Sequence, residues 1–243
     1  MTNQLPGTRA PVNAPPHNPK TTRRLLRKLA IWLLILVGLP YLLYKLNFPT
    51  YNWGQKTTVT VMTPAGERSG SAVVRVRWAD TPDILPDAPT FQSDVRGEAT
   101  VVDLGKGRYL FALISGAEQR GIAVFGDGRS YWLEQIKTVA ASRGETREIP
   151  PTHRPLMVTF ADINDPASVQ RVDPDDLAAS FGPGYALSSI TLAITGEPVS
   201  RGRVEAVLGW LDEYPEPKLG PATGQTTNIP FNRRVAHGDF IRR

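Results

Sequence analysis

The chain has 243 residues and no cysteine, which excludes disulfides, thiolate-bound metal centres and cysteine nucleophiles. Its hydrophobic share of 41% and charged share of 21% are ordinary for a chain that folds around a hydrophobic core. The net charge of +5 comes from the N-terminus, because residues 1–28 hold six of the 28 basic residues and none of the 23 acidic ones. The remainder has no basic excess, so we expect no nucleic-acid binding.

The N-terminal segment, residues 1–24, has the composition of a solvated tail. Its first 20 residues include five prolines and several small polar residues, with little that could be buried. Such a composition favours a disordered, partly polyproline-like conformation. We therefore predict a disordered, basic cytoplasmic tail over residues 1–24.

Residues 25–48 contain the longest apolar run of the chain. Leu29 to Tyr44 are 16 residues without a charge, and the run reaches 20 residues at Phe48 if Lys45 extends its amine toward the headgroups. A bilayer core needs about 20 residues of helix. We therefore predict a transmembrane helix that contacts lipid through its apolar and aromatic side chains, among them Leu29, Trp32, Leu36, Tyr41 and Tyr44. Tyr51 and Trp53 are expected at the membrane interface beside them.

Three interpretations of this run compete. A buried core helix would carry a polar face, and this run has none. A cleaved signal peptide would be followed by a small-x-small site, whereas the sequence continues with the bulky residues YLLYKLNF. We favour an uncleaved signal anchor. Arg23, Arg24, Arg27 and Lys28 precede the run and predict a cytoplasmic N-terminus, with the residues after about 50 on the outer side of the membrane.

Strand patterns dominate the next hundred residues. Residues 55–78 alternate apolar and polar side chains on both sides of Pro64-Ala65-Gly66, which predicts a β-hairpin with one buried face. The Pro-rich residues 79–89 predict a loop. Residues 97–115 predict a second hairpin that turns at Gly105-Lys106-Gly107. Residues 117–148 give no clear pattern beyond a short helix near 131–136.

The C-terminal half mixes strands with short helices. Residues 154–160 and 185–195 predict strands, and between them Asp173 and Pro174 are the expected start of a helix that buries Leu177 and Phe181 and ends at Gly182. Ser200 is the expected cap of another helix, whose buried face would comprise Val204, Val207, Leu208 and Leu211.

This order of elements predicts an α+β fold, in which the N-terminal transmembrane helix is followed by one mainly antiparallel-sheet domain with a few short helices. The domain is expected over residues 49–213. Residues 214–243 are Pro/Gly-rich and form a C-terminal arm, which either binds a partner or packs back on the domain.

Few residues suggest catalysis or cofactor binding. Only His17, His153 and His237 are available as histidine bases, and the common nucleotide, zinc-protease and serine-hydrolase motifs are absent from the sequence. Carboxylates for glycoside cleavage are present, but no pair of them stands out among Glu98, Asp103, Glu134, Glu197 and Glu205. We predict no catalytic, cofactor-binding or metal-binding residues.

An acidic stretch, ADINDPASVQRVDPDD at residues 161–176, offers oxygen ligands of the kind that calcium prefers. It lacks the alternating ligands, the central glycine and the terminal glutamate of an EF-hand loop. Its aspartates from Asp173 to Asp176 are better explained as the cap and the first-turn acidic residues of the predicted helix.

Several segments resemble an uncharacterised family of small single-pass, membrane-anchored bacterial envelope proteins with no assigned activity. The resemblance rests on TVMTPAGERSGSAVVRVRW (60–78), FADINDPASVQRVDPDDLAASFG (160–182) and HGDFIRR (237–243), together with residues 96–115 and 190–202. It implies an inner-membrane anchor and a periplasmic domain, and it supplies no catalytic residues.

Two classes of function remain. The favoured one is a non-enzymatic, membrane-anchored binding or scaffold protein of the cell envelope, whose partners are the lipid bilayer through residues 25–48 and envelope proteins or other copies of itself. The alternative is a membrane-tethered envelope hydrolase with an unrecognised carboxylate or serine site. The scarcity of histidine and the absence of cysteine favour the first.

Overall fold

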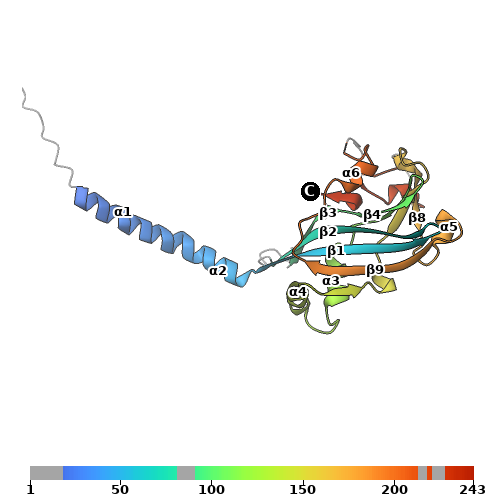
Figure 1. The fold of residues 1–243 in the computed structure, drawn as a ribbon. Helices are drawn as coiled ribbons and strands as arrows, with labels where there is room; N and C mark the ends of the chain where they lie inside the picture. Colours follow the sequence, from blue (N-terminus) through green and yellow to red (C-terminus); the bar gives the residue numbers. More distant parts are fainter. Residues whose placement is uncertain (1–18, 81–90, 213–217, 221–227) are drawn as a thin grey trace, which may run out of the picture. The chain divides into compact units, whose positions relative to one another are not determined.

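The computed structural model describes residues 19–80, 91–212, 218–220 and 228–243. The predicted tail over residues 1–18 and most of the predicted loop over 79–89 lie outside the described residues. The chain forms two separate units, one up to Pro49 and one from Thr50 to Arg243 (Figure 1).

The first unit is a continuous helix that begins within the predicted tail. It comprises α1 (Pro19–Leu33), the π-helical turn η1 (Leu34–Gly38) and α2 (Leu39–Asn47). The prediction that residues 19–24 are disordered is wrong: Pro19 occupies the first turn, where a missing N–H costs nothing, and the residues after it continue the helix. The π-helical turn lies directly before Pro40, whose ring cannot fit a regular helical turn.

Two antiparallel sheets form the core of the second unit, which confirms the predicted α+β class with mainly antiparallel strands. The six-stranded sheet has the order β10–β3–β2–β1–β9–β6, and the four-stranded sheet has the order β4–β5–β7–β8. The strands are β1 (Thr50–Thr63), β2 (Gly66–Asp80), β3 (Phe91–Glu98), β4 (Thr100–Gly105), β5 (Arg108–Ala112), β6 (Thr146–Glu148), β7 (Met157–Phe160), β8 (Val169–Val172), β9 (Ala186–Thr195) and β10 (Ile241–Arg242).

The β1–β2 hairpin lies at the centre of the large sheet. The two strands pair from Thr50↔Ala79 to Thr63↔Gly66, and Val59, Val61, Val74 and Val76 are buried on one face. The alternation in the sequence therefore predicted both the hairpin and its buried face. The second predicted hairpin is also present, as β4 and β5.

The buried face of the large sheet is covered in two parts. The four-stranded sheet covers one part, where the hydroxyl of Thr100 donates to the carbonyl of Thr57. Two helices cover the other part, α3 (Ala117–Phe125) and α4 (Trp132–Ala141), which contact β1 and β2. These helices fill the region in which the sequence predicted only a short helix near 131–136.

Trp53 belongs to this helix-covered part of the core. Its side chain is 2% exposed, and its indole N–H donates to the side chain of Gln55, which in turn donates to the carbonyl of Ala117 in α3. The expectation that Trp53 lies at a membrane interface is therefore wrong, because packing against α3 removes it from solvent. Tyr51 is half-buried and packs against the same core.

Two predicted helix caps are displaced in the structure. Helix α5 (Leu177–Phe181) is capped by Asp176, whose carboxylate accepts the N–H of Ala179, and not by Asp173. The reason is that Asp173 instead forms a turn with Asp175. Leu177 and Phe181 are buried as predicted.

Helix α6 (Arg203–Val207) likewise begins after Gly202 and is not capped by Ser200. Ser200 is used elsewhere, because it exchanges two hydrogen bonds with the backbone of Val73. The predicted four-residue face is only partly helical, although Val204, Leu208 and Leu211 are all buried.

The described residues of the C-terminal segment pack against the domain. Leu219, Val235, Phe240 and Ile241 are buried in the core, and β10 pairs with the end of β3. The remaining short helices are η2 (Pro151–His153), η3 (Pro166–Ser168), η4 (Phe231–Arg233) and α7 (His237–Phe240).

A close contact between the two sheets gives a first prediction. A Cβ atom at Gly70 in β2 would lie 2.0 Å from the carbonyl oxygen of Val101 in β4, which is part of the backbone and cannot rotate away. We expect Gly70→Ala to lower the free energy of unfolding by about 3 kcal/mol, because the sheets would have to separate. Gly209→Ala is the control, since its nearest atom lies at 4.0 Å. Equal denaturation midpoints for the two variants would contradict this packing.

Candidate functional site

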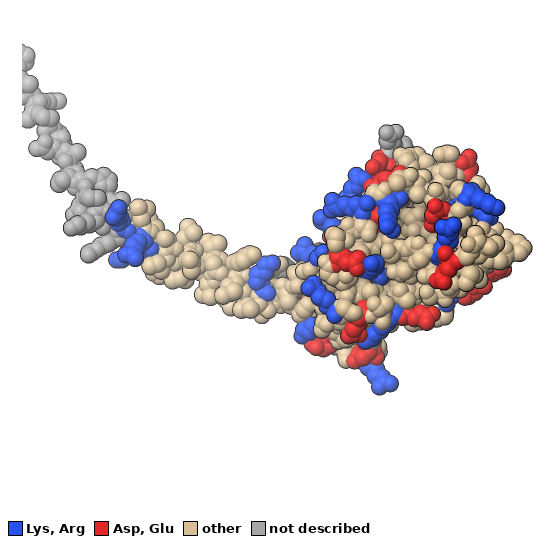
Figure 2. Space-filling model, in the orientation of Figure 1, with Lys and Arg blue, Asp and Glu red and all other residues tan. Residues whose placement is uncertain are grey.

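A cleft with a volume of about 510 Å³ opens beside the C-terminus of the domain. Arginines from several segments line it, and Figure 2 shows Lys and Arg gathered where Figure 1 places β3, α6 and the C-terminus. The lining residues are Arg75, Arg96, Gly97, Glu98, Val199, Ser200, Arg201, Glu205, Ile241, Arg242 and Arg243.

Strand pairing brings the first two arginines together. Arg75 of β2 and Arg96 of β3 are direct partners in the antiparallel register, so their side chains leave the sheet on the same face. At the next residue, Gly97 has a φ of 139°, and a Cβ there would lie 3.0 Å from the Val73 carbonyl oxygen. The glycine thus allows β3 to approach β2 closely where it enters the cleft.

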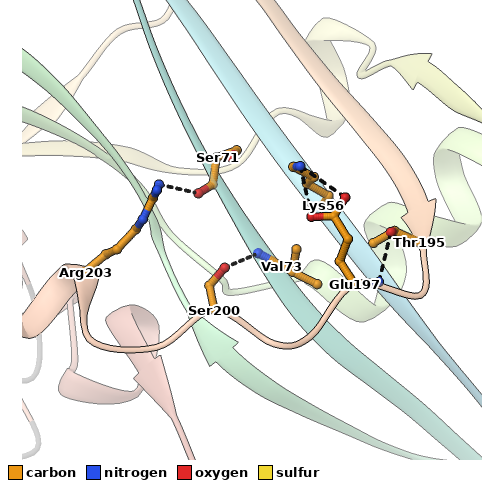
Figure 3. A network of polar contacts seen from close by, with 7 residues as sticks. All are labelled: Lys56, Ser71, Val73, Thr195, Glu197, Ser200 and Arg203. Carbon is orange, nitrogen blue, oxygen red and sulfur yellow. Dashed lines mark hydrogen bonds and ion pairs between the residues drawn. The ribbon is translucent and has the colours of Figure 1, made fainter.

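The segment between β9 and α6 forms a second wall, and polar contacts fix it to the sheet (Figure 3). Ser200 donates its N–H to the Val73 carbonyl and accepts the Val73 N–H on its hydroxyl, at 3.0 and 2.9 Å. Glu197 pairs with Lys56 of β1 at 3.0 Å. Arg203 donates to the carbonyl of Ser71 at 3.1 Å. Arg201 is therefore held beside the sheet by contacts on both sides of it in the sequence.

Glu98 is the buried carboxylate of the cleft, with 1% of its surface exposed. Its Oε2 accepts the N–H groups of Arg203 and Val204, at 3.0 and 3.2 Å, whereas its Oε1 has no hydrogen-bond partner among the described residues. Burial raises the pKa of the Glu98 carboxyl, although the two N–H donors act in the opposite direction. Glu98 thus ties the end of β3 to the start of α6.

The C-terminal residues form the third wall. Arg243 donates to Glu205 and to Asp212, at 2.8 and 2.7 Å, and these carboxylates raise the pKa of its guanidinium. Arg242 donates its Nε to the carbonyl of Gly238 at 2.8 Å. Pairing of β10 with Glu98 and Gly97 places both arginines at the cleft.

The five arginines differ in how they are neutralised. Arg243 is paired with Glu205 and Asp212, and Arg96 is paired with Asp94 at 3.0 Å. Within the part of the chain that the structure describes, Arg75, Arg201 and Arg242 form no ion pair. The cleft therefore presents three guanidinium groups without a carboxylate partner, which suits an anionic group.

Two of the five candidate carboxylates meet at this cleft, and the other three have separate contacts. Glu98 and Glu205 line it. Glu134 pairs with Lys137, Glu197 pairs with Lys56, and Asp103 accepts the N–H of Gly105 in a turn. The cleft arginines were not predicted from the sequence. Two signals in the sequence could have indicated them, namely the alternation of Arg75 and Arg77 along one strand and the adjacent Arg242 and Arg243.

The histidines do not join a catalytic group within the described residues. His153 is exposed and contacts the hydroxyl of Thr152. His237 is half-buried near Asp239, but Asp239 accepts hydrogen bonds from the hydroxyl of Ser115 and the N–H of Ala236. The serine and the carboxylate thus contact each other directly, without a histidine between them. His17 lies outside the described residues.

A buried arginine supports the segment that carries His153. Arg120 of α3 is 7% exposed and donates to the carbonyl oxygens of His153 and Ser115, at 3.1 and 2.9 Å. Burial lowers the pKa of its guanidinium to about 10, which leaves it protonated at neutral pH. Its charge is held by backbone oxygens, so Arg120 is part of the framework.

The aspartates of residues 161–176 serve as local caps. Asp162 accepts the N–H of Asn164, and Asp165 accepts that of Ala167, both at 2.9 Å. Asp175 pairs with Arg154 at 2.7 Å. Among the described residues, no group of three or more His, Asp or Glu side chains is placed to hold a metal ion.

The helix of the first unit has the exposed apolar surface that a membrane span requires. Leu26–Asn47 is a 22-residue stretch long and apolar enough to cross a membrane, with none of it buried. The residues expected to contact lipid are all exposed, namely Leu29, Trp32, Leu36, Tyr41 and Tyr44. Arg23, Arg24, Arg27 and Lys28 lie in α1, at the N-terminal end of this stretch.

Glu98 gives a prediction that pH can test. A carboxyl whose pKa is raised in the folded state binds its proton more tightly there than in the unfolded chain. The free energy of unfolding therefore falls as pH rises from the ordinary glutamate pKa to the raised value, by at most about 1.4 kcal/mol per pH unit. We expect Glu98→Gln to remove this fall. The measurement is denaturant unfolding at a series of pH values.

Glu148→Gln is the matched control, because Glu148 of β6 is exposed. Its unfolding profile should follow that of the wild type across the same range. A wild-type profile that runs parallel to that of Glu98→Gln would show that the burial of Glu98 has no effect on its titration.

Comparison with known proteins leaves the site to be interpreted from its own geometry. No family model, curated protein or solved structure matches the chain. The arginine cleft and the apolar N-terminal helix are therefore the two features from which a function is argued.

Proposed function

We propose that this is a single-pass, membrane-anchored protein of the bacterial cell envelope, in which residues 50–243 form a non-enzymatic binding or scaffold domain on the periplasmic side of the inner membrane. The helix Leu26–Asn47 carries this proposal, because a predominantly apolar helix of 22 residues with no buried residue is stable in a bilayer and costly in water. The proposal requires that no signal peptidase cleaves the chain between this helix and the domain.

Charge supports the proposed orientation. Arg23, Arg27 and Lys28 are exposed at the N-terminal end of the apolar helix, and such basic clusters stay in the cytoplasm. Lys45 near the other end is a single charge, and the helix contains no acidic residue. The basic asymmetry therefore favours a cytoplasmic N-terminus.

A binding role is supported by the site described above. The arginine cleft has a size and charge suited to a ligand. By contrast, the hydroxyl of Ser115 contacts Asp239 and no histidine among the described residues, so it has no histidine base to activate it for hydrolysis. Envelope proteins or other copies of the same chain remain the proposed protein partners. Affinity capture from detergent-solubilised membranes tests them, and a clean monomer would contradict the scaffold role.

Replacing lipid-facing leucines tests the anchor. Leu33 and Leu36 are 67% and 69% exposed, and an arginine at the centre of a membrane helix costs about 3 kcal/mol to insert. We expect Leu33→Arg with Leu36→Arg to shift the protein from the alkali-resistant membrane fraction to the soluble fraction. Met62→Arg, at a 45% exposed position on β1, should leave the fractionation unchanged.

The same preparation distinguishes an anchor from a cleaved signal and tests topology. Membrane-bound protein should retain its N-terminal residues on sequencing, and protease added to spheroplasts should digest the domain after residue 50. A mature chain that begins after the helix would overturn the anchor. Full protection from protease would overturn the orientation.

A further inference from the structure

We propose that the arginine-lined cleft binds a small organic oxyanion, a carboxylate or a phosphate ester. This inference names the ligand class of the binding role proposed above and rests on that role. It concerns only the domain and does not depend on which side of the membrane the domain lies.

Uncompensated charge is the first argument. Arg75, Arg201 and Arg242 line the cleft without an ion pair in the described part of the domain, while Arg96 and Arg243 are already paired with carboxylates. Guanidinium groups present several N–H donors in a planar fork that matches the oxygens of carboxylate and phosphate. An oxyanion in the cleft would supply the acceptors that these donors lack.

Repulsion within the sheet is the second argument. Arg75 and Arg96 are direct partners across β2 and β3, and like charges placed directly opposite are destabilising. Asp94, two residues before Arg96 in β3, pairs with Arg96 at 3.0 Å. Arg75 has no carboxylate partner among the described residues. An anion bound in the cleft between the two guanidinium groups would reduce this repulsion.

Neither carboxylate of the cleft forms an ion pair with Arg75, Arg201 or Arg242 among the described residues. Glu205 is already engaged by Arg243 at 2.8 Å. Glu98 accepts the backbone N–H groups of Arg203 and Val204, so its Oε2 is directed to the start of α6. The three unpaired guanidinium groups therefore remain available to a ligand.

The size of the cleft limits the ligand. A volume of about 510 Å³ lies within the range of small-molecule sites and is too small for an extended polymer. A small molecule, or the headgroup of a lipid, fits this limit.

Fixed walls make the site suitable for specific binding. Ser200 is held by two hydrogen bonds to Val73, and Lys56 holds Glu197 through both carboxylate oxygens (Figure 3). Arg201 follows Ser200 directly, so its backbone is already ordered. A site that is ordered before binding loses less entropy when the ligand arrives.

The test is calorimetric titration of the full chain, in a neutral detergent, with glycerol 1-phosphate as the probe. We expect saturable binding by the wild type. Arg201→Ala combined with Arg242→Ala should weaken it at least about tenfold, because two charged donors are lost. Arg68→Ala is the matched control, since Arg68 is an exposed arginine of β2 outside the cleft. Thermal melts without ligand must show that all variants remain folded.

Lipid provides the second arm of the test. If the natural ligand is a lipid headgroup, the wild type should melt at a higher temperature in phosphatidylglycerol nanodiscs than in phosphatidylcholine nanodiscs. Arg68→Ala should show the same difference, and the double variant should not. A free small molecule as the source predicts binding of the probe with equal melting temperatures in the two lipids.

Three results would overturn the proposal: no saturable binding at about 1 mM probe together with no lipid effect, full binding by the double variant, or an equal loss in Arg68→Ala. Release of inorganic phosphate from the probe would instead contradict the non-enzymatic role and leave anion binding intact. Fractionation and protease protection are measured separately, so failure of the cleft and failure of the anchor are distinguishable.

Discussion

The carboxylate of Glu98 joins segments of the domain that are far apart in the sequence. Its Oε2 accepts the first N–H groups of α6, from Arg203 and Val204, and the next residue, Ala99, donates its N–H to the carbonyl of Phe240. The end of β3 is therefore bound by α6 and by the C-terminal segment. Burying a carboxylate costs free energy, which these hydrogen bonds offset in part. The arginine cleft lies where the three segments meet, so its shape depends on this contact.

Much of the fold could be predicted because the signals are local. Burial alternates along β1 from Gln55 onward and along β2 from Val74 to Trp78, so Val59, Val61, Val74 and Val76 could be assigned to one face from the sequence alone. The apolar helix could be predicted for the same reason, since its composition needs no partner to be interpreted.

Two of the wrong predictions concern residues whose partners are distant in the sequence. Ser200 has the sequence context of a helix cap, but its partner is Val73, which is 127 residues away. Trp53 has the position of an interfacial aromatic, but α3 covers it. Asp173 and Asp176 are both good caps, and the choice between them depends on a turn that the sequence does not specify. The cleft was missed for the same reason, because Arg75, Arg96, Arg201 and Arg242 come from four segments.

The distribution of charge explains how a near-neutral domain can hold a basic site. The residues after 28 contain as many acidic as basic side chains to within one, and this balance argues against an extended nucleic-acid surface, which needs a basic excess over a wide area. It sets no limit on a single cleft. Strand register, the ordered segment before α6 and the chain terminus each contribute arginines to the same 510 Å³, whereas most acidic side chains pair or cap elsewhere. A domain with nearly balanced total charge can therefore still present a local group of arginines to a small anion, because the balance is a sum over the whole surface.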